Sequence, residues 1–290
     1  MLFLGTGAAD VIPNPFCSCK VCTDARKHPE KSRLRSMLLL DEKNLIDFGP
    51  DLAAAAIREN LDLSGLERVF ITHTHQDHLC LSNAGLVHMS STREKKPLEI
   101  YLSEAAYRSV EALYRPIEGV DLGLDEVGAH RRNEICFCPV KTGETFTCGK
   151  YRVLAVETTH RASEFENGVN YLFEDDNGRK LLYACDTGIY PEETIRQLRG
   201  SKVDILMMDA TWGSNEKDIN PRSHLGAKTF LSMLEMMLEN EIIRQDTCVY
   251  AIHINHKHDL THEEYQQWFN DHSKIQIVVA HDGLQLEWKI

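Results

Sequence analysis

Short apolar runs alternate with amphipathic stretches along the whole chain, which predicts a fold built from both strands and helices. The apolar runs are rich in β-branched and aromatic residues, and two pairs of them enclose polar turns that predict hairpins. Strands are expected at 1–4, 36–41, 45–48, 67–71, 98–102, around 136–138, 151–157, 170–174, 180–184, 203–208, 248–252, 275–280 and 284–288. Helices are expected at 52–60, 82–89, 104–114, 192–198, 223–240 and 261–271.

The order of these elements is β-rich, then mixed, and then β-rich and mixed again. Two similar halves, each a sheet edged by helices, predict an α+β fold in which a β-sandwich is covered by helices. No linker, low-complexity stretch or shift in composition interrupts the sequence, so one domain spanning residues 1–290 is expected. The segment 115–133 has three glycines and weak periodicity, and we expect an irregular loop at the rim of a pocket.

The heptapeptide that follows the expected strand 67–71 carries three histidines and one aspartate within six residues. A loop at the end of a strand is held by a rigid scaffold, where functional residues are common. Imidazole and carboxylate groups are ligands of zinc, iron and manganese. Four such groups so close together cannot all reach one tetrahedral ion, so they favour two ions over a solvated loop. The candidates are His73, His75, Asp77 and His78.

A second candidate metal site lies in the N-terminal loop at about 13–29. Cys17, Cys19 and Cys22 form a Cys-x-Cys-x-x-Cys motif, which favours three thiolates around one zinc ion over three reduced surface cysteines. The fourth ligand must come from elsewhere in the chain. The total of nine cysteines, several at short spacing, favours thiols and metal ligands over disulfides. Basic residues from Arg26 to Arg35 follow, as a solvated face or as an anion-binding patch.

Further polar motifs stand at the ends of later strands and at one helix start. They are Thr158-Thr159-His160, Cys185-Asp186-Thr187-Gly188, Ser223-His224-Leu225-Gly226 and His253-Ile254-Asn255-His256. Near the N-terminus, Gly5-Thr6-Gly7 favours a plain tight turn over a phosphate-binding loop, because the Walker lysine and the third Rossmann glycine are absent.

Together these motifs resemble the metallo-β-lactamase superfamily, whose H-x-H-x-D-H signature stands here at residues 73–78. The resemblance covers the whole chain and implies an αββα sandwich with a binuclear metal site at the edge between two mixed sheets. It also implies how two divalent ions, zinc or manganese, are held. One ion takes His73, His75 and His160, the other takes Asp77, His78 and His253, and Asp186 bridges the two.

Gly5-Thr6-Gly7, the three cysteines and the late histidine pair resemble more closely the PhnP-like phosphodiesterases of the carbon–phosphorus lyase pathway. In that family the second histidine of the late pair completes a structural zinc site, which implies His256 as the fourth ligand. The resemblance implies hydrolysis of a small or cyclic phosphodiester by a metal-bridging hydroxide. Asp77 would orient the hydroxide, and His224 would stabilise the developing charge or protonate the leaving group. Asp209 and Thr211 are candidates for fixing the tautomers of the ligand histidines.

The chain is acidic, with a formal net charge of −12. Extended nucleic acid is therefore not expected as a partner, because gripping it requires a basic face. No apolar run reaches the roughly 20 residues of a membrane helix, so no membrane partner is expected. The N-terminus lacks the basic region of a signal peptide, and a cytoplasmic protein is expected. The sequence leaves a homodimer open.

Other functions share parts of this pattern. A tRNA 3′-processing endonuclease shares the metal ligands but should carry an extended basic arm, which the sequence does not show. A thioester hydrolase of the glyoxalase II kind shares the first motif but does not need the cysteine module. A β-lactamase is disfavoured because Asp186 fills the position where those enzymes place a cysteine. A non-catalytic metal-binding module would be supported by failure to cleave any phosphodiester or thioester.

Overall fold

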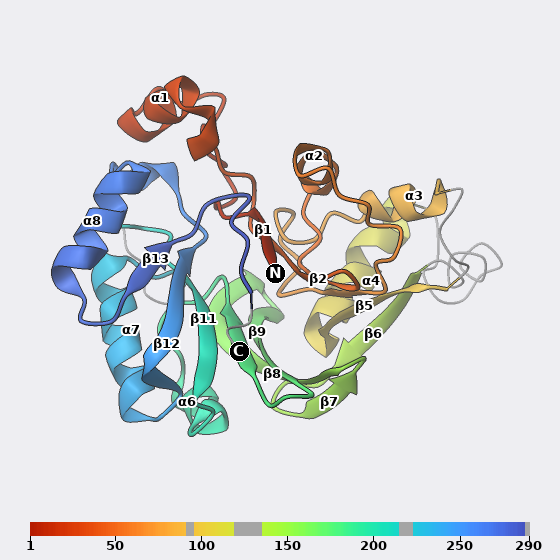
Figure 1. The fold of residues 1–290 in the computed structure, drawn as a ribbon. Coiled ribbons are helices and arrows are strands. Elements are labelled where there is room, and N and C mark those ends of the chain that lie inside the picture. The colour runs from red at the N-terminus through yellow and green to blue at the C-terminus, as the bar shows by residue number, and fades with distance from the viewer. Residues whose placement is uncertain (91–95, 119–134, 215–222, 288–290) are drawn as a thin grey trace.

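Two sheets lie face to face at the centre of the structure, and helices cover their outer faces (Figure 1). The computed structural model describes residues 1–90, 96–118, 135–214 and 223–287. Within these residues the first sheet has the order β1-β2-β3-β4-β5-β6. Its strands are β1 (Leu2–Gly5), β2 (Met37–Asp41), β3 (Asn44–Ile46), β4 (Arg68–Phe70), β5 (Leu98–Ser103) and β6 (Ile135–Val140).

The second sheet has the order β13-β12-β11-β10-β9-β8-β7 among the described residues. Its strands are β7 (Thr145–Cys148), β8 (Tyr151–Ser163), β9 (Glu166–Asp175), β10 (Lys180–Ala184), β11 (Val203–Asp209), β12 (Ile243–Ile252) and β13 (Ile277–Val279). The helices are α1 (Lys20–Lys27), η1 (Pro29–Lys31), α2 (Leu52–Arg58), α3 (Asn83–His88), α4 (Glu104–Glu118), α6 (Glu192–Leu198), α7 (Ala227–Glu239), η2 (His256–His258) and α8 (His262–His272).

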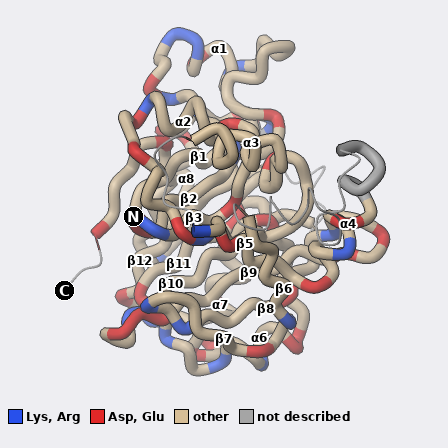
Figure 2. The backbone as a smooth tube through the Cα atoms, turned by 90° about the vertical axis from the view of Figure 1, so that its right-hand side faces the viewer, with Lys and Arg blue, Asp and Glu red and all other residues tan. Residues whose placement is uncertain are grey.

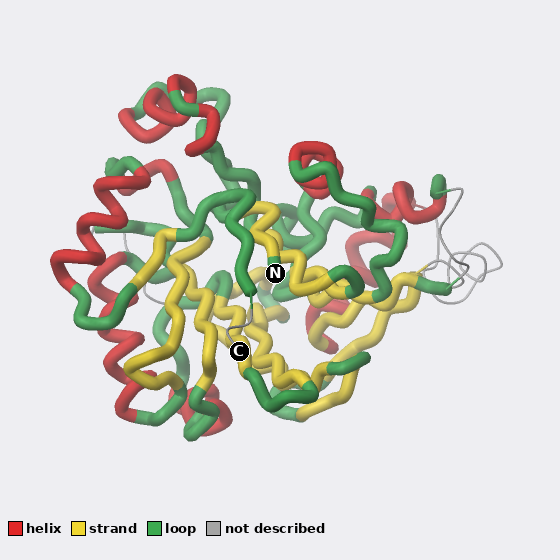
Figure 3. Tube along the Cα trace, in the orientation of Figure 1, coloured by secondary structure: helices red, strands yellow, loops and turns green. Residues whose placement is uncertain are grey.

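Three apolar clusters account for the four layers. The middle cluster, with Phe70, Tyr171 and Phe173, lies between the two sheets. One outer cluster packs helices such as α7 and α8 against the second sheet, and the other packs α2 and α4 against the first. In Figure 3 the strands accordingly form the interior and the helices the outer sides. The α+β sandwich expected from the sequence is confirmed.

The direction of the strands determines where the loops meet. Strands β3 to β6 run parallel, and so do β10 to β13. Because β9 is antiparallel to both β8 and β10, β8 points the same way as β10. The carboxyl ends of parallel strands share one edge of a sheet, which is where ligands bind in open α/β sheets. The loops after β4, β10, β11 and β12 are therefore placed to form a common site.

Several predicted boundaries differ from the observed ones. Strand β8 continues to Ser163, so His160 lies within the strand and not after it. Helix α4 continues to Glu118, and the predicted irregular loop loses its first four residues to this helix. The rest of that loop, 119–133, lies outside the described residues. The predicted strand 284–288 forms only an isolated bridge, between Leu2 and Gln285, in its described part.

The glycine turn near the N-terminus serves close packing. A Cβ on Gly5 would lie 1.9 Å from the carbonyl oxygen of Arg35, so only glycine fits there. The Gly7 N–H donates to the Leu34 carbonyl at 2.8 Å and the Ala8 N–H donates to the Ile254 carbonyl at 3.0 Å. Because these amides are used internally, they do not form a phosphate-binding loop.

The prediction of a solvated basic face between Arg26 and Arg35 is wrong for the last two of its basic residues. Arg33 is buried, and its guanidinium donates to Thr6 Oγ1 at 2.6 Å and to the Ala280 carbonyl. Arg35 forms an ion pair with Asp51 at 3.0 Å, so Asp51 does not cap α2 through its side chain. The pairing leaves no continuous anion-binding patch on this described segment.

Charges of both signs are interspersed along the described chain in the view of Figure 2. That view shows no continuous basic band, in line with the net charge of −12. None of the helices in the described part of the chain has the length and apolar character needed to cross a membrane.

Candidate metal centre

The candidate ligands converge at the edge where the parallel strands of both sheets end. The histidine loop follows β4, Asp186 follows β10 and His253 follows β12. Asp186 and His253 have positive φ angles of 52° and 60°, and Asp47, at the end of β3, has 64°. Such conformations cost about 1–3 kcal/mol each for non-glycine residues and cluster at functional sites. Three of the eight non-glycine residues with positive φ in the described structure thus lie at this edge.

The first cluster joins three imidazole nitrogens to one carboxylate. His75 Nδ1 lies 2.9 Å from His73 Nε2 and 3.1 Å from His160 Nε2. Asp186 Oδ2 lies 3.5 Å from the Nε2 atoms of both His73 and His160. Nitrogens around a tetrahedral zinc ion lie ~3.3 Å apart when each Zn–N bond is about 2.05 Å. The observed spacing therefore fits one ion held by four donors.

The second cluster shares Asp186 with the first. His253 Nε2 lies 2.9 Å from Asp186 Oδ1, and His78 Nε2 lies 3.5 Å from Asp186 Oδ2. Asp77 Oδ2 lies 3.2 Å from His78 Nε2 and 3.8 Å from His253 Nε2. Asp186 is buried between the two clusters: its Oδ2 lies 3.5 Å from nitrogens of both, and its Oδ1 lies beside His253. This arrangement brings together all seven residues expected to form the binuclear site.

An unsatisfied pair of nitrogens supports a cation at the second cluster. His78 Nε2 and His253 Nε2 are buried, and neither makes a hydrogen bond within the described structure. Buried polar atoms are nearly always paired, so such orphans require an explanation. A divalent cation between these nitrogens and the carboxylates of Asp77 and Asp186 would satisfy all of them. The residues present therefore fit the group that the donor set implies.

Outer hydrogen bonds fix how the ligand imidazoles are turned. His160 Nδ1 donates to the Ser223 carbonyl at 3.0 Å, which leaves its Nε2 lone pair directed at the cluster. The Thr211 hydroxyl donates to Asp209 at 2.8 Å and accepts from His253 Nδ1 at 2.8 Å. The predicted contacts of Asp209 and Thr211 with the site are thus present.

Asp47 is a site residue that the sequence analysis missed. It is fully buried, and its Oδ2 accepts from His78 Nδ1 at 2.7 Å. Its Oδ1 accepts from both the N–H and the hydroxyl of Thr72 at 2.9 Å. The available signal was its place at the end of an apolar strand, next to the strand that leads into the histidine loop.

Glu166 was also missed. It is buried on β9, and its carboxylate accepts from the Thr74 N–H at 2.8 Å and from the Thr74 hydroxyl at 2.5 Å. The second sheet thereby holds the histidine loop of the first sheet. No local pattern identifies Glu166, because its partner lies 92 residues away.

His224 lies beside the binuclear cluster. Its Nδ1 is 2.8 Å from Asp209 Oδ2, and its ring centroid is 4.7 Å from that of His160 and 5.2 Å from that of His253. Burial disfavours the charged imidazole, but the Asp209 carboxylate outweighs this effect and raises the pKa of His224 above its usual value. The contact with Asp209 favours a protonated His224 imidazole, and it leaves Nε2 as the nitrogen directed away from Asp209.

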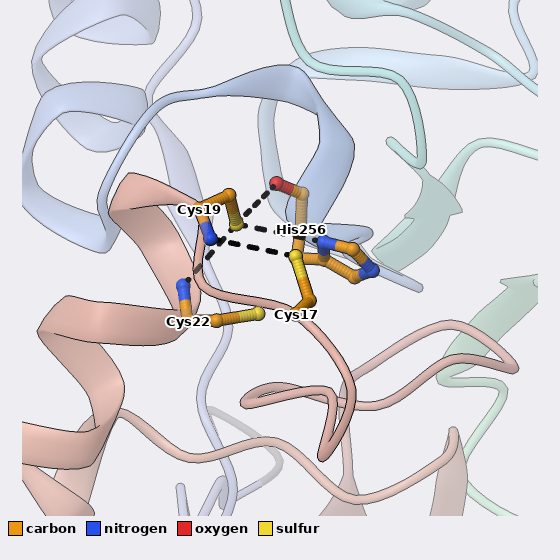
Figure 4. Close-up of side chains that lie close together, drawn as sticks. All are labelled: Cys17, Cys19, Cys22 and His256. Carbon is orange, nitrogen blue, oxygen red and sulfur yellow. Dashed lines mark hydrogen bonds between the residues drawn. The ribbon is translucent and has the colours of Figure 1, made fainter.

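The three cysteines and His256 form a separate cluster (Figure 4). Cys19 Sγ lies 3.6 Å from His256 Nδ1, which matches the ~3.6 Å expected for sulfur and nitrogen on one tetrahedral zinc. His256 Nε2 lies 3.2 Å from Asp10 Oδ2, so its other nitrogen is oriented toward the sulfurs. Cys17 and Cys22 complete the group.

Of the other cysteines considered earlier, three lie outside the metal clusters of the described residues, whereas Cys185 lies within 4.8 Å of ligand atoms of His78, Asp186 and His253. Cys136 is exposed, Cys138 is half-buried and Cys148 is buried, and no such group includes any of them. Cys185 is buried beside Asp186, with its Sγ 3.4 Å from Asp186 Oδ1. Burial raises the pKa of the Cys185 thiol, which favours a protonated core thiol.

The fold and the site define a metal-dependent hydrolase of the metallo-β-lactamase superfamily. Residues 43–254 match the family described as "Beta-lactamase superfamily domain", and the chain belongs to this family. The fold of this family implies divalent metal ions, which agrees with the His/Asp clusters of the structure.

Proteins that are similar to this chain in sequence have different names. The chain is 26% identical to coenzyme PQQ synthesis protein B of Methylobacterium radiotolerans, with 99% of each chain covered. It is 24% identical to ribonuclease Z of Brevibacillus brevis, over 62% of this chain and 67% of that protein. An octanoyltransferase of Porphyromonas gingivalis is 27% identical over 38% of this chain, but the match spans only 21% of the octanoyltransferase.

Two solved structures are similar to this chain over its whole length. A diphosphatase of the PhnP family is 25% identical, with a TM-score of 0.72, and covers 100% of this chain and 97% of its own. The short form of human tRNase Z has a TM-score of 0.62 at 16% identity over 100% of this chain and 99% of its own, which shows a shared fold. The chain thus resembles PhnP-family hydrolases in both fold and sequence.

Proposed function

We propose that this protein is a phosphodiesterase that hydrolyses a small or cyclic phosphodiester at a binuclear metal centre. The observation that carries the proposal is the position of the buried Asp186 carboxylate between two sets of histidines: its Oδ2 lies 3.5 Å from nitrogens of both sets, and its Oδ1 lies 2.9 Å from His253 Nε2. A carboxylate in this position would be shared between two divalent ions. The similarity to a PhnP-family diphosphatase supports phosphoester chemistry.

In this proposal His73, His75 and His160 hold one divalent ion, and Asp77, His78 and His253 hold the other, with Asp186 shared. When bound, such ions would supply a nucleophile by lowering the pKa of a water molecule, and they would neutralise charge on the phosphoryl oxygens. Zinc and manganese both accept this donor set. Cys17, Cys19, Cys22 and His256 hold a separate zinc ion with a structural role.

The protein's own residues then position and transfer protons. The Asp209 carboxylate holds His224 Nδ1, so the opposite nitrogen can donate to the developing charge or to the leaving alkoxide. Asp77, next to His78 at the cluster, orients the attacking oxygen. Asp47 and Thr211 hold the imidazoles of His78 and His253 in the ligating orientation.

A tRNA 3′-processing endonuclease is the second candidate, because the chain is similar to ribonuclease Z. The net charge of −12 argues against it, since phosphate neutralisation by basic side chains provides most of the affinity for nucleic acid. A small substrate, a cytoplasmic location and independence of membranes remain our expectations, and a homodimer is compatible with them.

Metal analysis combined with substrate comparison tests the proposal. We expect three ions per chain. Two should exchange with a chelator, and one should be released only with thiol-modifying reagents. Bis-p-nitrophenyl phosphate and a cyclic nucleotide should be cleaved faster than a precursor tRNA. A protein with one iron ion and no activity on any phosphodiester would refute the proposal, and faster cleavage of precursor tRNA would favour the endonuclease.

A further inference from the structure

A cavity lies beside the candidate metal centre, between the start of α4 and the turn that joins β8 to β9. Its volume is about 570 Å³, which is within the range of small-molecule pockets. Glu166 lines the cavity and also holds the Thr74 N–H of the histidine loop at 2.8 Å. Val169 lines it too, and its N–H donates to the Thr72 carbonyl at 2.9 Å. The cavity and the metal centre therefore share a wall.

An exposed aromatic ring lines this cavity. Phe165 lies in the turn after β8, five residues beyond the candidate ligand His160, and its side chain is 80% exposed. A single exposed apolar residue is ordinary on a protein surface. An aromatic face that borders a pocket next to a reaction centre, however, can stack on a planar group of the substrate, and such stacking is worth about 1–3 kcal/mol per base.

The charges of the cavity select against a second anionic group. Four glutamates and two arginines line it, which leaves a net charge of −2. The glutamates are Glu104, Glu157, Glu164 and Glu166, and the arginines are Arg108 and Arg161. A further phosphate would be repelled, whereas carboxylates accept hydrogen bonds from the hydroxyl and amino groups of a neutral ligand.

Three hydrogen bonds pre-organise these polar groups. Asn167 donates to Glu157 Oε1 at 3.0 Å. Arg161 donates to the carbonyls of Ser163 at 3.1 Å and Glu164 at 2.8 Å, which ties its guanidinium to the turn that presents Phe165. These bonds fix the backbone of the turn that carries Phe165.

We propose that this cavity binds the organic group of the phosphodiester, a neutral planar ring with polar substituents such as a nucleoside, stacked on Phe165. The proposal rests on the phosphodiesterase function, because it places the phosphoryl group at the metal centre and the nucleoside in the adjoining cavity. The negative lining rejects substrates that carry a second phosphate on the nucleoside, and it also rejects a longer RNA strand.

Kinetics of the full-length, metal-loaded enzyme with two chromogenic esters test the proposal. The p-nitrophenyl ester of thymidine 5′-monophosphate carries a nucleoside, and methyl p-nitrophenyl phosphate does not. Phe165→Ala should raise KM for the thymidine ester roughly 5- to 150-fold, the range that corresponds to loss of one stacking interaction. The variant should leave kcat and all constants for the methyl ester within about twofold. Phe165→Tyr should restore the wild-type KM.

Phe16→Ala is the matched control, because Phe16 is 99% exposed on the cysteine loop and does not line the cavity. It should leave both esters unaffected. An equal change for both esters in Phe165→Ala, or no change for either, would overturn the proposal.

Binding measurements keep this proposal distinct from the function it rests on. Thymidine binding, followed by ligand-observed NMR, should weaken at least fivefold in Phe165→Ala whether or not the protein cleaves phosphodiesters. Thymidine 3′,5′-bisphosphate should bind more weakly than thymidine 5′-monophosphate, and the double variant Glu104→Gln/Glu164→Gln should narrow the difference. Equal thymidine binding by wild type and Phe165→Ala refutes the nucleoside cavity. Absent hydrolysis with preserved nucleoside binding refutes only the phosphodiesterase function.

Discussion

Replacing Asp47 by asparagine should weaken one of the two exchangeable ions without changing the shape of the site. Asp47 accepts three hydrogen bonds on two oxygens, from His78 Nδ1 at 2.7 Å and from the N–H and hydroxyl of Thr72 at 2.9 Å. Asparagine offers only one acceptor oxygen. Whichever way the amide turns, its NH₂ group meets a donor that the carboxylate had satisfied.

The consequence for the metal centre depends on His78. If the amide keeps Thr72, its NH₂ group faces His78 Nδ1, and the favoured tautomer then carries the proton on Nε2. A protonated Nε2 cannot ligate an ion. Loss of such an outer partner lowers metal affinity roughly 10- to 100-fold, which is about 1.4–2.7 kcal/mol. If the amide turns the other way, a buried donor of Thr72 is left unpaired at a cost of about 1–3 kcal/mol in folding free energy.

A chelator competition assay on the purified protein separates these outcomes. We expect one exchangeable ion to bind 10- to 100-fold more weakly in Asp47→Asn, and the ion held by the cysteines to be unchanged. Thermal unfolding of the metal-free protein reports the second outcome. Asp51→Asn is the control, since Asp51 lies four residues away and pairs with Arg35 outside the cluster. Wild-type affinity for both exchangeable ions together with wild-type thermal stability would refute the reasoning.

Three further predictions concern other residues of the two metal sites and of the core. His224→Ala should lower kcat for phosphodiesters with alkoxide leaving groups roughly 10²–10⁴-fold while metal analysis finds the wild-type ion content, and a lost ion would instead show a structural role. Cys19→Ser should remove one non-exchangeable zinc per chain and lower the midpoint of thermal unfolding, which a retained ion would contradict. Arg33→Ala should destabilise the fold by about 1–3 kcal/mol in urea unfolding, because it removes the buried guanidinium that donates to Thr6 Oγ1 and to the Ala280 carbonyl; a change below about 0.5 kcal/mol would contradict this.

The layered architecture and the gathering of the metal-site candidates were predictable from local sequence. Apolar strands followed at once by histidine or aspartate are visible without any tertiary information. Since the ends of parallel strands share an edge, His73, Asp186 and His253 could be expected to meet. The resemblance of the motif order to one superfamily then assigned each candidate to an ion.

The supporting residues were not predictable, because their partners are distant in the chain. Glu166 holds Thr74 from 92 residues away, and Arg33 is buried by contacts with Ala280. The start of α7 shows the same effect. A helix was expected from about Ser223, but it begins at Ala227. The intervening backbone serves the site instead, where the Ser223 carbonyl accepts from His160.

The late histidine pair links the two metal sites in a way that bears on synthesis of the protein. Cys19 and His256 are separated by 237 residues, yet they belong to one cluster. At a translation rate of about 5–20 residues per second, roughly 12–50 s pass between the appearance of the cysteines and that of their histidine partner. During this interval the thiols of the cysteine loop lack the imidazole that completes their site. We therefore expect the thiols of the nascent chain to be more sensitive to oxidants before His256 has emerged than after the site is complete.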